Sequence, residues 1–318
     1  MGDHNDWQGC VSYSPSHPRI QPWNYSCWLR WSLLPLLFVV AVSARAMLPH
    51  TLNASALSAS DIVIQSTQFS DRVEGGLQVS LAFPQTQLRE LLISRAALCD
   101  IAIIHFNIKS CLYLDGETTD VEVSDAEPES LLRIFGARKD YQSPEDSGFF
   151  DFHYQLKEDS PERTVVDIHG DQGPFGTLDY RIRLEAMADG AGSMLNITFS
   201  VSYSQVTHWV QRLYFSSIAR NKIGFSSSPA RGRQADDYVR GLRAMIERNV
   251  MRLFLSLQVA LEKPPEADLD ARLHRWFELT EQYPRQLREM DLETYLDSKR
   301  REVANQRRLQ QDYREQGK

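Results

Sequence analysis

The sequence predicts an α+β fold in which an antiparallel sheet is followed by one long helix. Residues 180–186 and 195–203 alternate strictly between apolar and polar side chains, the pattern of strands with one buried and one solvated face. Residues 238–262 instead repeat apolar positions every three or four residues, the spacing of an amphipathic helix. Strand-like patterns lie before residue 204 and are absent after residue 268, so strands and helices are separated along the chain.

Apolar or β-branched runs predict six further strands before the two alternating ones. These runs are residues 62–64, 77–83, 102–114, 131–135, 149–156 and 164–169. Gly75 and Gly76 are a turn signal near the first two runs, and the Gly-Pro-Phe-Gly stretch at 173–176 predicts another turn. Gly190 and Gly192 separate the two alternating segments, which we therefore expect to form a hairpin.

Three segments of the domain have helical spacing. Residues 84–98 place four leucines on one stripe, and residues 206–219 are amphipathic and aromatic. The long helix at 238–262 is capped by Asp236 or Asp237 and is stopped by the two prolines that follow it. Its apolar positions are Val239, Leu242, Ile246, Val250, Leu253, Leu257 and Leu261.

The C-terminal segment, residues 268–318, is predicted to be a helical extension of the domain. A short amphipathic helix surrounds Leu273 and Trp276, and from Leu287 onward the chain is charged and helix-prone with few apolar residues. We expect a solvated helix or a fraying tail there. The alternative is a helix that binds a partner protein of the cell envelope or a membrane surface, although its mixed charge makes attraction to anionic lipid weak.

The order of these elements resembles the helix-grip fold of the START and polyketide-cyclase-like (SRPBCC) superfamily. The resemblance covers residues 56–262 and depends on element order. It implies a curved antiparallel sheet wrapped on the long C-terminal helix, with an apolar cavity between them. Four segments are also similar to a set of uncharacterised exported bacterial proteins, a resemblance that implies an exported domain and no particular chemistry: 98–111, 176–182, 246–252 and 283–287.

Residues 29–46 have the composition of a secretory signal peptide. Arg30 supplies positive charge, residues 33–42 form a short apolar core, and Ala44 and Ala46 are the small residues that a signal peptidase requires. The apolar run is shorter than the about 20 residues of a membrane-spanning helix. We therefore expect cleavage after Ala46 and export to a bacterial periplasm. An uncleaved signal that anchors the protein in the inner membrane, or a buried helix, is the alternative.

Residues 1–28 precede this signal, although a bacterial signal normally begins a few residues before its apolar core. They are polar, rich in Trp, Pro and Ser, and have no helical or strand period. An over-called start codon, with initiation near Leu29, explains such a disordered lead. A cytoplasmic extension of an anchored protein is the alternative.

Export would leave two cysteines in the mature chain. Cys10 and Cys27 precede the predicted cleavage site, whereas Cys99 ends a helical pattern and Cys111 lies in the following strand pattern. In an oxidising compartment these two can pair as a disulfide, and two independent buried thiols are the alternative. Neither has the CxxC or CxxH spacing of a structural zinc site.

Composition and motifs exclude several kinds of function. The formal net charge of -7 argues against a nucleic-acid-binding protein, which would present a basic face. The sequence has no HExxH, GxxxxGK, GxSxG or paired CxxC motif, so we expect no metal and no cofactor. His153 falls on the opposite strand face from Phe152 and Tyr154, which predicts that it faces solvent.

The cavity implied by the helix-grip resemblance is the predicted binding site. Strand and helix parity place apolar walls on the sheet and an apolar roof on the long helix, and the hydroxyls of Tyr154 and Tyr180 could add polar groups. The alternative is that these side chains only fill a core. The candidates are Tyr154, Tyr180, Ile182, Phe199, Tyr203, Ile246, Arg248, Asn249 and Leu253.

Three functions follow from these features. The sequence favours an exported protein that binds a lipid or another apolar small molecule, because a cavity is implied and catalytic motifs are absent. A structural or interaction protein of the cell envelope, acting through its C-terminal helices, is the second hypothesis. The third is an enzyme, such as a cyclase, lyase or hydrolase, that uses Tyr and Arg side chains in the same cavity.

Overall fold

The computed structural model describes residues within one compact unit, Ser55–Lys318. The described ranges are 62–115, 130–137, 139–173, 177–203, 222–227, 238–264 and 267–316. The expected boundary between residues 262 and 268 falls inside this unit. Outside the described residues lie the predicted lead at 1–28, the signal peptide at 29–46 with its cleavage site at Ala46, the helix at 206–219 and most of the turn at 173–176.

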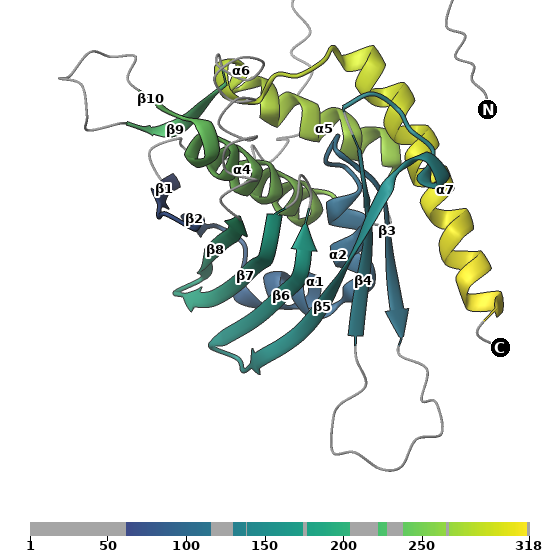
Figure 1. The fold of residues 1–318 in the computed structure, drawn as a ribbon. Coiled ribbons are helices and arrows are strands. Elements are labelled where there is room, and N and C mark those ends of the chain that lie inside the picture. Colours follow the sequence, from purple (N-terminus) through teal and green to yellow (C-terminus); the bar gives the residue numbers. More distant parts are fainter. Residues whose placement is uncertain are drawn as a thin grey trace, which may run out of the picture. The chain divides into compact units, whose positions relative to one another are not determined.

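Eight strands form one antiparallel sheet in the order β1-β2-β8-β7-β6-β5-β4-β3 (Figure 1). The two strictly alternating segments are β7 and β8, and Gly190 with a φ of 59° makes the predicted hairpin turn between them. The strands are β1 (Ile62–Gln68), β2 (Arg72–Leu81), β3 (Ile108–Asp115), β4 (Ser130–Gly136), β5 (Gly148–Asp159), β6 (Arg163–Gly173), β7 (Thr177–Asp189) and β8 (Gly192–Tyr203).

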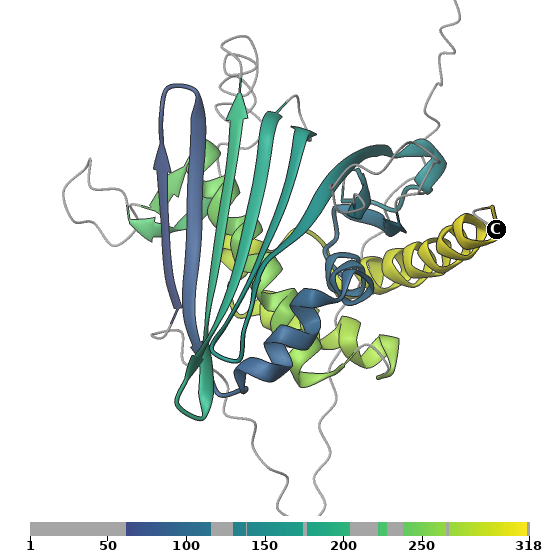
Figure 2. The ribbon, with the colours of Figure 1, turned by 90° about the horizontal axis from the view of Figure 1, so that it is seen from below.

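The long helix α4 (Gly241–Glu262) crosses one face of this sheet, which we call the inner face (Figure 2). It packs on β1, β2 and β8, and the main core lies between it and these strands. A sheet interrupted early by helices and closed by one long helix is the arrangement expected of a helix-grip fold, and the α+β class is confirmed. The remaining helices are α1 (Gln85–Ile93), α2 (Arg95–Ala102), α5 (Leu269–Glu281), α6 (Pro284–Leu287) and α7 (Leu292–Gln316).

The predicted turn at Gly75 and Gly76 is wrong, because both glycines lie inside β2. Gly75 lies directly beneath α4, and a Cβ atom there would collide with Cγ2 of Ile246. A Cβ on Gly76 would lie 3.1 Å from the carbonyl oxygen of Ile197. The close approach of helix and sheet therefore explains the glycine at position 75.

The segment expected as one helix at 84–98 is two helices, α1 and α2, separated at Ser94. This residue has an extended backbone, and its hydroxyl accepts a hydrogen bond from the backbone N–H of Ala97 at 3.2 Å, which caps α2. The following strand begins at Ile108 rather than at Ala102. Short apolar runs such as 101–104 suit a buried helix and a buried strand equally well, so the pattern alone misplaced this boundary.

The long helix begins at Gly241, three residues later than predicted. Tyr238–Arg240 forms the short strand β10, which pairs with β9 (Ile223–Ser227). Gly241 has a φ of 66°, a left-handed conformation that glycine adopts without strain. The chain therefore turns at Gly241 from a strand into the helix.

Cys99 and Cys111 form the predicted disulfide. Cys99 lies on α2 and Cys111 on β3, with 5.0 Å between their Cα atoms. The bond closes a short loop that links the early helices to β3, the strand at one edge of the sheet.

The C-terminal helix α7 is docked on the domain rather than solvated or frayed as expected. It lies along β3, and Tyr295, Lys299 and Glu302 on its inward side are buried (Figure 1). The Oε1 atom of Gln306 accepts a hydrogen bond from the Cys111 backbone N–H at 2.7 Å, and Gln310 bonds both the N–H and the carbonyl of Tyr113 at 3.1 Å. Polar side chains can be buried here because each has a partner.

Candidate functional site

A row of apolar side chains crosses the inner face at the centre of the sheet. The strand register places Tyr154 of β5 opposite Ile168 of β6, Ile168 opposite Ile182 of β7, and Ile182 opposite Phe199 of β8. Side chains of directly paired residues lie on the same face of a sheet. The predicted walls Tyr154, Ile182 and Phe199 are therefore brought together. Together with Ile168 they form what we call the inner row.

Tyr180 lies beside the inner row and joins it to an aromatic cluster. Its ring centroid lies 5.1 Å from that of Phe152 and 4.7 Å from that of Phe199. Gly170, which pairs with Tyr180, makes room for this cluster, since a Cβ there would approach the Phe152 ring to 2.8 Å. Such tilted and edge-to-face ring pairs stabilise a fixed arrangement.

The helices cover this face unevenly. In the described part of the chain α4 packs mainly on β1, β2 and β8, and α1 packs on β6 and β7. Phe199 is buried, whereas Tyr154, Tyr180 and Ile182 are only partly buried. The candidate site is thus an apolar surface on β5–β7 that the described elements leave partly open.

The tyrosine hydroxyls of this region differ in their hydrogen bonding. Tyr154 donates to the carbonyl of Leu92 at 3.1 Å, and burial raises the pKa of its phenol to about 12. Tyr203 donates to the carbonyl of Phe69 at 2.8 Å. Among the described residues the Tyr180 hydroxyl has no hydrogen-bond partner, and burial raises its pKa well above the ordinary value. The phenols of Tyr154 and Tyr180 are therefore neutral near pH 7, and the Tyr180 hydroxyl makes no hydrogen bond to another described residue.

The predicted roof residues of α4 divide between two faces of that helix. Ile246 is buried against Gly75 of β2, and Leu253 is partly buried against the core. Arg248 instead donates from Nε to the carbonyl of Gln286 at 2.6 Å and pairs with Glu289. The structure does not bring Arg248 to the inner row.

Asn249 is partly buried on α4, next to Val250. With Arg248 directed to the connection before α7, the expected combination of Tyr and Arg side chains in one cavity does not form. An acid–base reaction that requires both is therefore not supported at the inner row.

Two hollows in the described part of the chain lie elsewhere. One of about 440 Å³ lies between α5 and the start of α7, around Glu281 and Met290. The other, of about 390 Å³, is on the opposite, outer face of the sheet, around Arg181 and Arg183. Neither is lined by Tyr154, Tyr180 or Phe199, although Ile168 and Ile182 contribute to the lining of the outer hollow.

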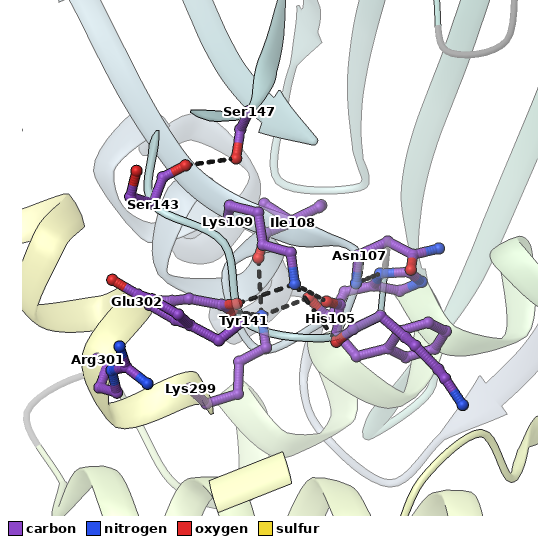
Figure 3. A network of polar contacts seen from close by, with 12 residues as sticks. His105, Asn107, Ile108, Lys109, Tyr141, Ser143, Ser147, Lys299, Arg301 and Glu302 are labelled. Atoms are coloured by element: carbon purple, nitrogen blue, oxygen red, sulfur yellow. Dashed lines mark hydrogen bonds and ion pairs between the residues drawn. The ribbon is translucent and has the colours of Figure 1, made fainter. Parts of the chain in front are cut away.

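A buried polar cluster that the sequence did not reveal fixes α7 (Figure 3). The ammonium group of Lys299 donates to the carbonyls of Ile103, His105 and Ile108 at 2.7–2.8 Å. The Glu302 carboxylate lies 2.5 Å from Lys299 Nζ and 2.9 Å from Lys109 Nζ. All three charged side chains are buried.

Burial controls the protonation of this cluster. It lowers the pKa of Lys299 to about 8, although Glu302 acts in the opposite direction. Burial, reinforced by Arg252, Lys299 and Lys109, also lowers the pKa of His105 well below its ordinary value. His105 is therefore neutral, and its Nδ1 accepts a hydrogen bond from the Asn107 N–H at 3.1 Å. Because these groups are closed off from solvent, we assign them a role in holding the loop before β3 against α7.

Other expectations about function concern the histidines and metal ions. His153 lies on the outer face, stacked on His169 with 4.9 Å between ring centroids, so its predicted orientation is confirmed. Within the described ranges, His, Cys, Asp and Glu side chains do not gather in the groups of three that could hold a metal ion. None of the described helices has the length and apolar character needed to cross a bilayer.

Comparison with known proteins gives similar solved structures only. No family model and no curated protein matches the chain. The chain is similar to a START superfamily protein from Mycobacterium smegmatis, with 15% identity over 47% of this chain and 90% of that chain and a TM-score of 0.29. It is similar to the Zhui aromatase/cyclase from Streptomyces sp. R1128, with 12% identity over 68% of this chain and 95% of that chain and a TM-score of 0.28.

A third similar structure is norcoclaurine synthase from Thalictrum flavum in complex with dopamine and hydroxybenzaldehyde. Its identity is 6% over 51% of this chain and 82% of that chain, and the TM-score is 0.31. Superpositions of this quality carry no argument about chemistry. The chain has a START-like, helix-grip fold, and this assignment rests on its own strand order and on the position of α4.

Proposed function

We propose that this protein binds a lipid or another apolar small molecule on the inner row of its sheet. The observation that carries the proposal is the hydroxyl of Tyr180, which lies among the rings of Phe152 and Phe199 and has no hydrogen-bond partner among the described residues. Ligand sites combine a mainly apolar surface with a few polar groups that fix orientation. Tyr180 is partly buried, and a ligand would supply its phenol with the hydrogen-bond partner that the described residues do not.

The composition of the site indicates the chemistry of the ligand. Tyr154, Ile182 and Leu253 are partly buried and would supply apolar contact area. The Tyr180 phenol is neutral at physiological pH, as an ordinary tyrosine is, and burial raises its pKa further; it therefore suits a carbonyl, hydroxyl or ether group rather than a cation. We infer a ligand with an extended apolar body and a single polar group near Tyr180.

We further propose that the protein acts outside the cytoplasm, after removal of residues 1–46. The signal pattern at 29–46 and the disulfide between Cys99 and Cys111 support this, because disulfides persist in oxidising compartments. N-terminal sequencing of the native protein tests it, with Met47 as the expected first residue. A native chain that retains residues 29–46 would contradict cleavage.

Binding is tested on protein purified under native conditions. Native mass spectrometry should detect a co-purifying apolar molecule, and a fluorescent fatty-acid probe should bind and be displaced by it. Tyr180→Phe removes only the hydroxyl, so the affinity should fall by about two- to twelvefold, since a hydrogen bond contributes about 0.5–1.5 kcal/mol. Ile182→Trp fills the inner row and should abolish probe binding.

Val63→Ala is the matched control, because Val63 is exposed on β1 and its backbone parity places it on the outer face. Its affinity for the probe should equal that of the wild type. Thermal unfolding of each variant separates loss of binding from loss of folding. An unchanged affinity in a folded Ile182→Trp variant would refute the inner row as the binding surface.

A further inference from the structure

The outer face of the sheet carries a groove lined by charged and polar side chains, with Ile168 and Ile182 also contributing to its lining. Its volume is about 390 Å³. The register aligns His169, Arg181 and Ser200 in one line across β6, β7 and β8, and Asp167, Arg183 and Thr198 in the next. Lys157 of β5 completes its charged lining.

The groove concentrates positive charge in an acidic protein. Its lining contains Lys157, Arg181 and Arg183 and a single carboxylate, that of Asp167. The whole chain has a formal net charge of -7. A local excess of cations inside a hollow attracts anions more strongly than the average surface does.

Most of the hydrogen-bond donors in the groove make no hydrogen bond to another described residue. Arg181 donates from Nε to Asp179 at 2.7 Å, and Arg183 donates from Nη1 alone to Asp167 at 3.2 and 3.3 Å. Among the described residues, the other N–H groups of these two arginines and the hydroxyls of Thr198 and Ser200 have no partner.

An anionic ligand could readily replace the carboxylates in the ion pairs of Arg181 with Asp179 and of Arg183 with Asp167. The side chains of Arg181 and Arg183 are 64% and 45% exposed. Ion pairs in such positions contribute little to stability, because water solvates and screens both charges. Each guanidinium can therefore turn from its carboxylate to an incoming anion at small cost.

We propose that this groove binds a small molecule bearing phosphate or carboxylate groups, held by Arg181 and Arg183 with Ser200 and Thr198. The planar fork of arginine matches the oxygens of both groups with two parallel hydrogen bonds. The two arginines are two residues apart on one strand face, which separates their Cα atoms by about 6.6 Å. That spacing suits a ligand with two linked anionic groups. The arginine side chains of this site and the side chains of the inner row lie on opposite faces of the sheet.

His169 provides an internal reporter of occupancy. Burial lowers the pKa of this imidazole, and nearby cations lower it further. The charged and titratable groups around it are His153 and Lys157 from β5, Asp167 and Asp171 from β6, and Arg181 from β7. An anion bound beside Arg181 would offset these cations and raise the pKa of His169.

The test is a calorimetric and NMR titration of the folded protein with pyrophosphate, and separately with citrate, at constant ionic strength. Arg181→Gln and Arg183→Gln should each weaken binding by about tenfold or more, since a hydrogen bond to a charged group contributes about 1.5–3 kcal/mol. The pKa of His169 should rise on saturation, while that of His274 on α5 should not. The two probes show whether phosphate or carboxylate is preferred.

Arg163→Gln is the matched control, because Arg163 lies near the other end of β6, outside the groove, and pairs with Glu158 and Glu185. This variant should keep the wild-type affinity. Equal loss in Arg163→Gln and Arg181→Gln, or equal shifts at His169 and His274, would show only general attraction to a charged surface and overturn the proposal. Wild-type affinity in both folded groove variants, or failure of both probes to bind, would overturn it as well.

Discussion

Replacing Glu302 by Gln should strongly destabilise the protein. The Glu302 carboxylate is fully buried, with Lys109 Nζ at 2.9 Å and Lys299 Nζ at 2.5 Å. The substitution leaves both cations in place without their shared counter-ion. Removing one partner of a buried ion pair costs about 3–5 kcal/mol, a large part of the about 5–15 kcal/mol by which native proteins are stable.

The companion variant Lys109→Met should cost less, because it leaves Lys299 and Glu302 as a balanced pair. Its main effect is to remove the hydrogen bond from Lys109 Nζ to the carbonyl of Phe106 at 2.9 Å, and an unsatisfied buried group costs about 1–3 kcal/mol. The balance of buried charge therefore decides which of the two variants is less stable.

Urea unfolding followed by circular dichroism at neutral pH gives the free energy of unfolding for each variant. Arg308→Gln is the control on the same helix, because the Arg308 side chain is 53% exposed in its pair with Glu145; the loss should be at most about 1 kcal/mol. A loss in Glu302→Gln no larger than in Arg308→Gln would refute the reasoning. So would a larger loss in Lys109→Met than in Glu302→Gln.

Three further predictions concern stability. Cys99 and Cys111 are 12 positions apart, and replacing both by Ser should lower the free energy of unfolding by about 3 kcal/mol in the loop-entropy model. Reductant should lower the thermal midpoint of the wild type and leave that of the double variant unchanged. Gly75→Ala forces a Cβ against Ile246 and should cost about 1–3 kcal/mol, whereas Gly148→Ala, where a Cβ meets nothing within 4 Å, should unfold at nearly the wild-type urea midpoint. The folded-state pKa of Lys299 is lowered from 10.5 to about 8. Between these values the unfolded chain binds more protons than the folded one, so this residue's contribution to the free energy of unfolding should rise with pH. The free energies of unfolding of wild type and Lys299→Met, compared from pH 7.5 to pH 10, check this, and a wild-type value that falls relative to the variant as pH rises would contradict it.

The elements predicted correctly are those in which apolar and polar residues recur at regular intervals along the sequence. Strands β7 and β8 each bury one face, so their period appears in the order of residues, and the apolar positions of α4 recur every three or four residues although its second half is buried on all sides. Gly75 and Gly76 were misread because two adjacent glycines are typical of a turn, whereas Gly75 makes room for Ile246 of α4 and Gly76 lies close to the Ile197 carbonyl of β8. A tertiary contact of this kind leaves no local signal.

The docking of α7 could not be predicted from hydropathy. The residues it buries include Lys299, Glu302 and Gln306, and a charged helix normally indicates solvent exposure. Their partners lie on β3 and the loop before it, more than 190 positions earlier in the chain. Burial of these groups is explained only when the three-dimensional position of the partners is known.

The inner row followed from parity, because Tyr154, Ile182 and Phe199 occupy matching positions in alternating strands. Arg248 was grouped with them through its nearness to Val250, yet a helix turns by about 100° per residue. Two steps from Ile246 therefore place Arg248 on the far side of α4, where it meets Glu289. The outer groove was missed since it depends on strand register, which brings Arg181 beside His169.

The glutamines of α7 have a consequence for how the chain matures. β3 forms one edge of the sheet, and unpaired strand edges are templates for association with other chains. Gln306 and Gln310, which occupy that edge, are synthesised after every strand of the sheet. A nascent chain or a variant truncated before α7 thus carries the strands of the sheet with the β3 edge uncovered, and protection from self-association arrives only once α7 has been synthesised.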